Sequence, residues 1–141
     1  MVKVKIKRLR DDIILPHYVH EEDAGMDLYS TMNICLEQNQ RILVPLGFSM
    51  EFSKGYVALI KGKSGLALNK GLAILGGVID SNYRGEYAVI ILNTGYDDLV
   101  IKKNQKIAQL LIQPVERAEF EEVNELSNTV RGDGGFGSTG L

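Results

Sequence analysis

Three stretches of the chain carry side chains that could do chemistry on a phosphorylated substrate. The first, KGKSGLA at residues 61–67, combines a cation, a hydroxyl group and glycine amides, which are the groups that bind phosphate. Its Gly62-Lys63-Ser64 matches the end of a P-loop, but that pattern needs a glycine five positions earlier, where the chain has Val57. We therefore interpret residues 61–67 as a phosphate-binding turn of another kind.

The second stretch, GGVIDSNYRGEY at residues 76–87, places Asp80 between an apolar pair and a turn. We expect a buried strand to end there, and the aspartate could simply cap its own turn. It could also lie at the edge of a pocket, where a carboxylate can orient and deprotonate a water molecule. Tyr83 would then supply a flat wall beside it. The residues alone leave both roles open.

The third stretch is the glycine-rich C-terminus, RGDGGFGSTGL at residues 131–141. A flexible terminus is the simplest interpretation, because glycine loses much conformational entropy when it is ordered. Arg131, Ser138, Thr139 and the glycine amides are nevertheless phosphate donors, and Phe136 offers a face on which a nucleobase can stack. We favour a mobile arm that closes over a ligand. Fully extended, it would span roughly 36–40 Å, enough to reach another subunit.

Short strands are the elements that must position these residues. Alternating, β-branched or aromatic residues predict strands over residues 2–7, 41–52, 55–61, 86–93, 98–101 and 107–115. The strict alternation of VKVKIK at residues 2–7 predicts a half-buried strand. The one expected helical turn is 64–70, which Ser64 could cap. Many short strands predict an all-β barrel or sandwich, one domain over residues 1–130, followed by the arm over 131–141.

Composition limits the classes of partner. The chain has 141 residues and a net charge of −2, with 45% hydrophobic and 24% charged residues, as in a single globular domain. This charge argues against a nucleic-acid partner, and no apolar run predicts a signal peptide or a membrane partner. The single cysteine, Cys35, excludes an intrachain disulfide and favours a reducing, cytoplasmic compartment.

Together these stretches closely resemble the homotrimeric deoxyuridine triphosphatase (dUTPase) family. The segments that carry the resemblance occur in the family's order, as AGMDLYS (24–30), GKSGLA (62–67), GVIDSNYRGEY (77–87), KIAQLLI (106–112) and RGDGGFGSTG (131–140). The resemblance implies a distorted β-barrel or jelly-roll fold (a β-clip) with one short helix and a mobile arm. It also implies a homotrimer with shared active sites. The implied reaction is Mg²⁺-assisted hydrolysis of dUTP to dUMP and pyrophosphate at the α-phosphate, which excludes uracil from DNA.

The resemblance also implies how the base, the sugar and the attacking water are held. Asp80 matches the catalytic aspartate that positions the water. Tyr83 matches the tyrosine packed under deoxyribose, where a 2′-hydroxyl would clash. The slot that reads the edge of uracil would be formed by backbone that includes Val78, Ile79 and Ala88.

The phosphates and the metal ion would be held by the remaining matches. The residues implied to bind phosphate on the body of the protein are Lys63, Ser64, Gly65 and Gln109. Those implied on the arm are Arg131, Gly137, Ser138 and Thr139, with Phe136 stacking on uracil. Asp27 would support Mg²⁺ indirectly, through its water shell.

Several positions in the second, fourth and fifth of these segments, Asp133 among them, depart from the family's usual pattern. Lys63 and Lys106 stand where relatives usually have arginine, so any bidentate contact there is lost. We expect Lys63 to make a single ionic contact, near the phosphates or with Asp27. Two alternatives stay open. One is a dCTP deaminase or a bifunctional deaminase and dUTPase of the same fold, with Glu86 as the candidate carboxylate. The other is a dUTP-gated regulatory protein.

Overall fold

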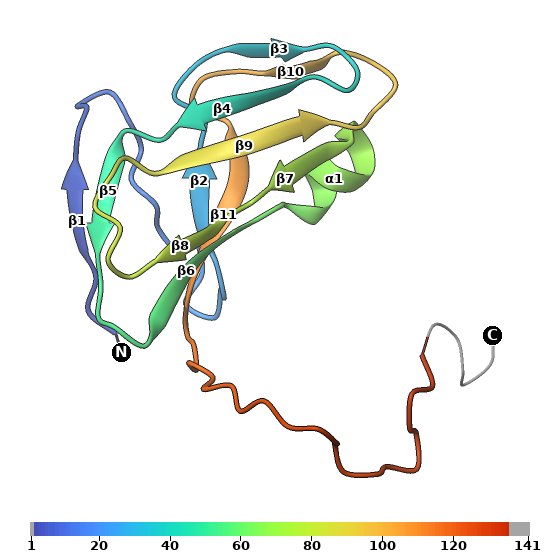
Figure 1. Ribbon diagram of the computed structural model, residues 1–141. Coiled ribbons are helices and arrows are strands. Elements are labelled where there is room, and N and C mark those ends of the chain that lie inside the picture. Colours follow the sequence, from blue (N-terminus) through green and yellow to red (C-terminus); the bar gives the residue numbers. More distant parts are fainter. Residues whose placement is uncertain (1, 136–141) are drawn as a thin grey trace.

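The computed structural model describes residues 2–135, and every element below lies in that range. The body of the protein is built from short strands, joined by one short helix in the described part of the chain (Figure 1). In chain order these are β1 (Lys5–Arg8), β2 (Met26–Tyr29), β3 (Ile34–Leu36), β4 (Arg41–Pro45), β5 (Phe48–Glu51), β6 (Tyr56–Lys61), α1 (Ser64–Lys70), β7 (Leu72–Leu75), β8 (Val78–Asp80), β9 (Ala88–Asn93), β10 (Leu99–Ile101) and β11 (Lys106–Pro114).

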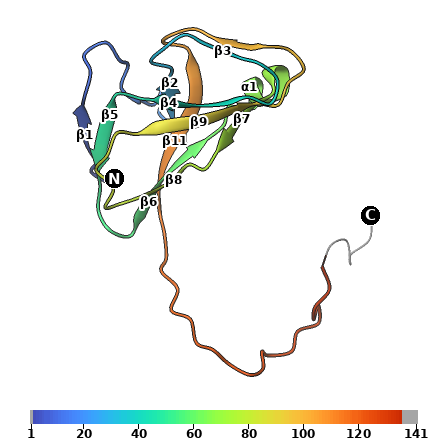
Figure 2. The same ribbon diagram turned by 45° about the horizontal axis from the view of Figure 1, so that its top comes forward.

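Antiparallel ladders wrap around one interior. The largest has the order β2-β11-β6-β8, the second has the order β4-β9-β7, and two smaller ladders pair β1 with β5 and β10 with β3. Figure 2 shows these ladders curving around a shared interior as a jelly-roll-like barrel that does not close. The expected all-β fold class is therefore confirmed.

Apolar side chains from all the ladders fill that interior. The largest fully buried side chains are Tyr87, Phe48, Leu28, Leu46, Leu72, Ile91, Ile101, Ile107 and Leu110. β9 alternates buried and more exposed residues, as expected for a strand with one face on the core. Burial of this apolar surface is the main term that stabilises the fold.

Asn93 is a polar residue at the end of β9 that is fully buried. Its Nδ2 donates to the carbonyl oxygens of Leu36 and Asp97, both at 2.9 Å, and its Oδ1 accepts from Gly95 N at 2.9 Å. Because these bonds satisfy the buried amide, Asn93 can tie β3 to the β9–β10 turn without the penalty of an unpaired polar group.

Several expected strands differ from the observed ones. The expected half-burial of residues 2–7 holds only for the first part of that run. Val2 and Val4 are half-buried and Val4 packs against the core, whereas β1 itself is exposed along its whole length and pairs only with β5. The expected buried strand before Asp80 is wrong. β8 forms the edge of its ladder, and Val78 is 72% exposed. The predicted strand 41–52 is divided into β4 and β5 by a turn at Gly47, whose φ of +75° suits glycine.

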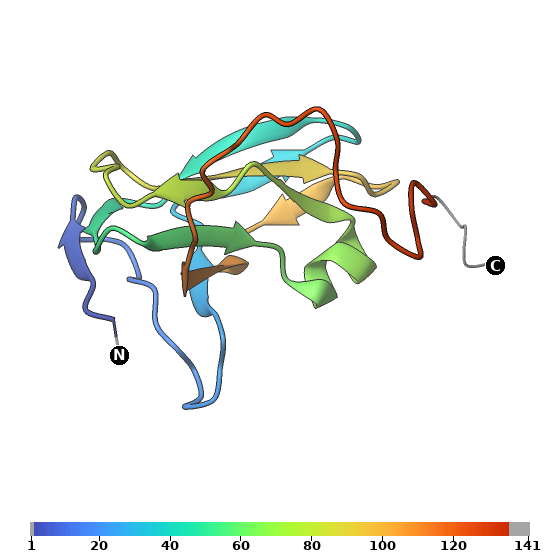
Figure 3. The ribbon, with the colours of Figure 1, turned by 60° about the horizontal axis from the view of Figure 1, so that its bottom comes forward.

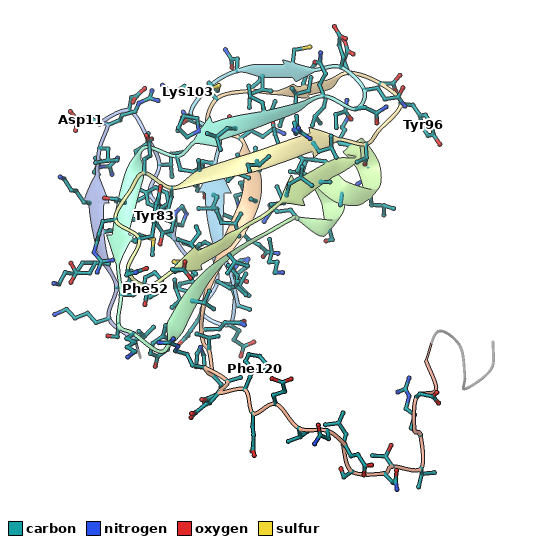
Figure 4. All side chains as sticks on the ribbon, viewed as in Figure 1. Asp11, Phe52, Tyr83, Tyr96, Lys103 and Phe120 are labelled. Carbon is teal, nitrogen blue, oxygen red and sulfur yellow. The ribbon has the colours of Figure 1, made fainter. Side chains whose placement is uncertain are left out.

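After β11 the chain leaves the body of the protein. Residues 116–135 contain no strand or helix and extend away from the barrel (Figures 1 and 2). Phe120, labelled in Figure 4, is 93% exposed. The division between a domain over 1–130 and an arm over 131–141 stays a prediction. Within residues 2–135, no helix has the length and apolar character needed to cross a membrane.

Candidate active site

A buried carboxylate with two lysines lies at the centre of the candidate site. Asp27 on β2 is only 6% exposed. Its Oδ1 accepts from Lys63 Nζ at 2.5 Å, and its Oδ2 lies 2.7 Å from Lys106 Nζ. Lys63 thus makes its expected ionic contact, with Asp27. We call these three residues the Asp27 cluster.

Electrostatics keep the Asp27 cluster charged. Burial alone would raise the pKa of Asp27, but the hydrogen bonds and positive charges of Lys106 and Lys63 outweigh burial and hold this pKa below its ordinary value. The hydrogen bond to Asp27 raises the pKa of Lys106. At neutral pH the cluster is therefore one carboxylate with two ammonium groups, and it carries a net positive charge towards the neighbouring hollows.

A β-bulge brings Lys106 to this cluster. In β11, Gln109 pairs with Asp27 and Lys106 pairs with Tyr29, with a shift of register between Lys106 and Ala108. Residues three apart point to opposite faces of a regular strand, whereas a bulge inserts one extra residue and re-aims the side chain beyond it. Lys106 and Gln109 can therefore both face Asp27 while Ala108 stays buried in the core.

Lys63 and Ser64 lie where β6 passes into α1. Lys63 has an extended backbone (φ −98°, ψ 125°) and occupies the N-cap position, with no side-chain capping bond in the described structure. The expected cap by Ser64 is wrong, because Ser64 is the first residue of the helix. The first N–H groups of a helix have no acceptor within it, so the exposed Ser64 and the amides beside it can donate to a ligand.

Gln109 lies between Asp27 on β2 and Lys61 on β6. Its Nε2 donates to Gly62 O at 2.9 Å. A Cβ atom on Gly25 would lie 2.8 Å from Gln109 Oε1 and 3.3 Å from Gln109 Cβ, so Gly25 leaves the space that this side chain occupies. The amide is thus held at a defined place in the wall of the site.

Two hollows meet at the Asp27 cluster. The larger has a volume of about 610 Å³ and is lined on one side by α1, and the smaller has about 290 Å³ and is lined by the loop before β2. Both are lined by Lys63, Lys106 and Gln109. The structure therefore brings together all of the residues implied to bind phosphate on the body, which are Lys63, Ser64, Gly65 and Gln109. Asp27, implied to act on the metal ion through water, lies beside them.

Asp80 lies away from these hollows. It pairs with Val57 near the start of β6, whereas Lys61 at the end of β6 pairs with Gln109. At about 3.3 Å per residue, Val57 and Lys61 are roughly 13 Å apart along the strand, and Lys63 lies further on. In Figure 3, β8 ends on the side of the barrel away from α1. One chain does not bring Asp80 to the phosphate-binding residues.

The residues expected around uracil are themselves divided between two further hollows. Val78 and Asp80 line one of about 600 Å³ beside the start of β6. Ile79 and Ala88 line an apolar one of about 100 Å³ between β8 and β9. This division follows from β8, whose alternate side chains point to opposite faces.

Tyr83 lies on the loop that follows Asp80 (Figure 4). Its backbone N–H donates to Asp80 O at 3.1 Å, and Arg84 Nη1 donates to the carbonyl oxygens of Ser81 at 2.7 Å and Tyr83 at 3.0 Å. The Tyr83 ring is 45% exposed and lies 6.0 Å from the ring of Tyr87. The loop therefore presents a supported aromatic surface to the solvent.

The buried Tyr87 beneath it has no partner for its hydroxyl group among residues 2–135. Burial raises the pKa of Tyr87 to about 12, because the charged phenolate would be poorly solvated there. No sequence pattern distinguishes this tyrosine from an exposed one. The described residues also contain no group of three His, Cys, Asp or Glu side chains that could bind a metal ion by themselves.

The arm is only partly described. Arg131 is exposed, and its Nε donates to Gly134 O at 2.8 Å. The other residues expected to act on the arm lie outside the described residues, and these are Phe136, Gly137, Ser138 and Thr139. The role of the arm stays a prediction.

Comparisons with known proteins agree on one family. A family model described as dUTPase matches residues 11–140. The deoxyuridine 5′-triphosphate nucleotidohydrolase of Clostridium acetobutylicum is 44% identical, over 100% of this chain and 99% of that protein. Its counterpart from Anaplasma marginale is 45% identical, over 99% of both.

Solved structures show the same similarity. The dUTPase of Staphylococcus bacteriophage 80alpha with dUPNHPP superposes with a TM-score of 0.91 at 27% identity, over 99% of both chains. A mutant dUTPase of phage phi11 of S. aureus shares the fold, with a TM-score of 0.82 at 24% identity over 89% of this chain and 99% of that one. That mutant coordinates a structural Mg(II) ion.

Proposed function

Because this chain belongs to the dUTPase family, we propose that it hydrolyses dUTP to dUMP and pyrophosphate. The observation that carries this proposal is the hollow beside the Asp27 cluster, where two lysines, a serine hydroxyl and helix amides converge. A protein with a net charge of −2 can accept a triphosphate only through such a local group of donors. The volume of about 610 Å³ is in the range of small-molecule sites.

Asp80 is the proposed catalytic residue. Its carboxylate orients a water molecule and takes a proton from it as the water oxygen attacks the α-phosphorus. The bond from the α-phosphorus to the bridging oxygen breaks, and pyrophosphate leaves with that oxygen. Lys63, Ser64 and Gln109 hold the phosphates so that water, phosphorus and leaving oxygen are in line, and they stabilise the charge that develops.

The separation of Asp80 from the phosphate-binding residues supports a shared active site. Both groups lie on one ladder but near opposite ends of β6, so Asp80 and the Asp27 cluster of one chain cannot both act at the same α-phosphate. We propose a homotrimer in which one chain supplies Asp80 and Tyr83 and a second supplies the Asp27 cluster. Light scattering tests the trimer. Mixed assembly of Asp80→Asn with Lys63→Ala, whose activity is reduced, should give more activity than the two variants assembled separately, and no gain would count against a shared site.

The residues present fit a Mg²⁺ ion that is carried by the triphosphate. Both oxygens of Asp27 already accept from lysines, so this carboxylate would act on the ion only through water. Mg²⁺ keeps several waters and usually binds through phosphate oxygens and few carboxylates, which agrees with the donors described above. Bound there, the ion would neutralise phosphate charge.

The deaminase alternative is not favoured. Glu86, its candidate carboxylate, accepts a hydrogen bond from Gly47 N at 2.8 Å and so supports the backbone of the neighbouring turn. An assay for ammonia released from dCTP tests this directly.

The single cysteine also supports a cytoplasmic location, where thiols stay reduced.

The decisive test is release of pyrophosphate from dUTP, dCTP, dTTP and UTP, each with and without Mg²⁺. Of these four nucleotides, we expect the protein to hydrolyse only dUTP. Asp80→Asn should keep nucleotide binding and lose turnover, because the amide cannot take the proton. Near wild-type activity in that variant would contradict the mechanism.

A further inference from the structure

The Tyr83 side chain folds back over the backbone of Gly85. A Cβ atom built on Gly85 would lie 2.5 Å from Tyr83 Cζ and 2.9 Å from Tyr83 Cε2, and it would also collide with the hydroxyl oxygen. Gly85 is not among the glycines with positive φ. The position therefore needs glycine for the space that it leaves and not for its backbone conformation.

The ring is held in this place from two other directions. Its hydroxyl group donates to Glu86 O at 3.1 Å. Its inner face meets Tyr87, which packs in turn on Phe48 with ring centroids 5.4 Å apart. Tyr87 and Phe48 are each 1% exposed, so a fixed aromatic layer runs from the core to the surface. Gly85 is where the outermost ring of this layer meets the backbone.

We propose that Gly85 is a positioning residue that sets the sugar selectivity of the enzyme. Without a Cβ atom at this position, Tyr83 lies flat on the loop and closes the space that a 2′-hydroxyl would need. The inference rests on the proposed function, in which Tyr83 packs under deoxyribose. A residue that displaces the ring opens that space without touching the substrate itself.

An added methyl group should displace the ring and leave the loop folded. The colliding atoms are at the far end of a side chain that can rotate. Rotation breaks the bond from the Tyr83 hydroxyl group to Glu86 O, but the bonds from Arg84 to the carbonyl oxygens of Ser81 and Tyr83 do not involve the colliding atoms. Rejection of a single extra hydroxyl group by packing gives a selectivity of about 10². We therefore expect Gly85→Ala to reduce the preference for dUTP over UTP by roughly tenfold, which is part of that range.

A double-mutant cycle tests whether Gly85 acts through Tyr83. The kcat/KM values for dUTP and UTP are measured for the wild type, Gly85→Ala, Tyr83→Ala and the double variant. Binding of dUpNHpp and of its ribose counterpart is measured for the same proteins, and circular dichroism checks their folding. Gly85→Ala should lower the selectivity in the wild type and change nothing further in the Tyr83→Ala background, where its steric partner is absent.

The outcomes separate this inference from the proposed function. A wild type that does not hydrolyse dUTP contradicts the proposed function. A wild type that prefers dUTP, with the same preference in Gly85→Ala, overturns the role of Gly85 alone. If Gly85→Ala lowers the selectivity by the same factor in the Tyr83→Ala background, the role of Gly85 is overturned too. If Gly85→Ala does not fold, the same comparison is made in the Tyr83→Phe background, which lacks the nearest colliding atom.

Discussion

Replacing Asp27 by asparagine tests the electrostatic centre of the site. The substitution keeps the size of the side chain but removes the charge that holds Lys63 and Lys106 together. The two ammonium groups would then face each other across a neutral amide. We expect a less stable protein in which both lysines hold phosphate less well.

The structure sets the size of the effect. Exposed ion pairs contribute about 0.2–1 kcal/mol, whereas breaking a buried pair costs about 3–5 kcal/mol. Asp27 is buried, but the side chains of Lys63 and Lys106 are 30% and 44% exposed, so solvent screens both contacts. We expect Asp27→Asn to lower the free energy of unfolding by about 2 kcal/mol at neutral pH, between these limits.

The loss should also depend on pH. The pKa of Asp27 is lower in the folded protein than its ordinary value of 3.8, so the carboxylate stabilises the fold above pH 3.8. That contribution is lost as the pH falls through the folded-state pKa. Urea unfolding of wild type and variant, measured from neutral pH to below 3.8, should show the difference between them shrinking.

Asp23→Asn is the matched control. Asp23 lines the same smaller hollow, but its Oδ2 accepts from the backbone N–H groups of Val19 at 3.2 Å and His20 at 2.9 Å. An asparagine oxygen can accept those bonds, so this variant changes the charge by the same amount and should be destabilised less. If Asp27→Asn were as stable as the control, or if its deficit were the same at every pH, the ion pairs would not be its cause.

Further predictions follow from single side chains. Tyr87→Phe removes a buried hydroxyl that has no partner among residues 2–135, and it should raise the free energy of unfolding by about 1 kcal/mol. The difference in stability between this variant and the wild type should grow above pH 10, because the raised pKa of Tyr87 costs the wild type stability there. A lower urea midpoint for Tyr87→Phe than for the wild type would contradict the prediction. Lys63→Ala should lower kcat/KM for dUTP at least about tenfold, and Lys63→Arg should retain more activity; an unchanged value in Lys63→Ala would show that position 63 does not assist catalysis. Asp12→Asn breaks contacts of 2.8 Å to Arg10 and 2.6 Å to Lys103 at the surface, so its small loss of thermal stability should vanish in high salt.

Much of the fold could be predicted from local patterns. The runs that became β6, β9 and β11 are long and apolar enough to identify a strand, and the Gly and Asn residues between them mark turns. β2 and β3 have four and three residues and no clear alternation, so they could not be recognised. The alternation in residues 2–7 predicted burial correctly only at Val2 and Val4, because β1 lies on an outer edge, where Ile6 is 40% exposed.

By itself, the sequence determined the all-β class, the family and the chemical groups available to the site, because these depend on residue types and their order. Only the tertiary structure decided which groups meet. A bulge in β11 turns Lys106 towards Asp27, and the regular two-residue alternation of a strand does not predict this orientation. The length of β6 separates Asp80 from Lys63, although both residues are proposed to act in one reaction. Gly85 and Tyr83 constrain each other only because the loop folds back on itself.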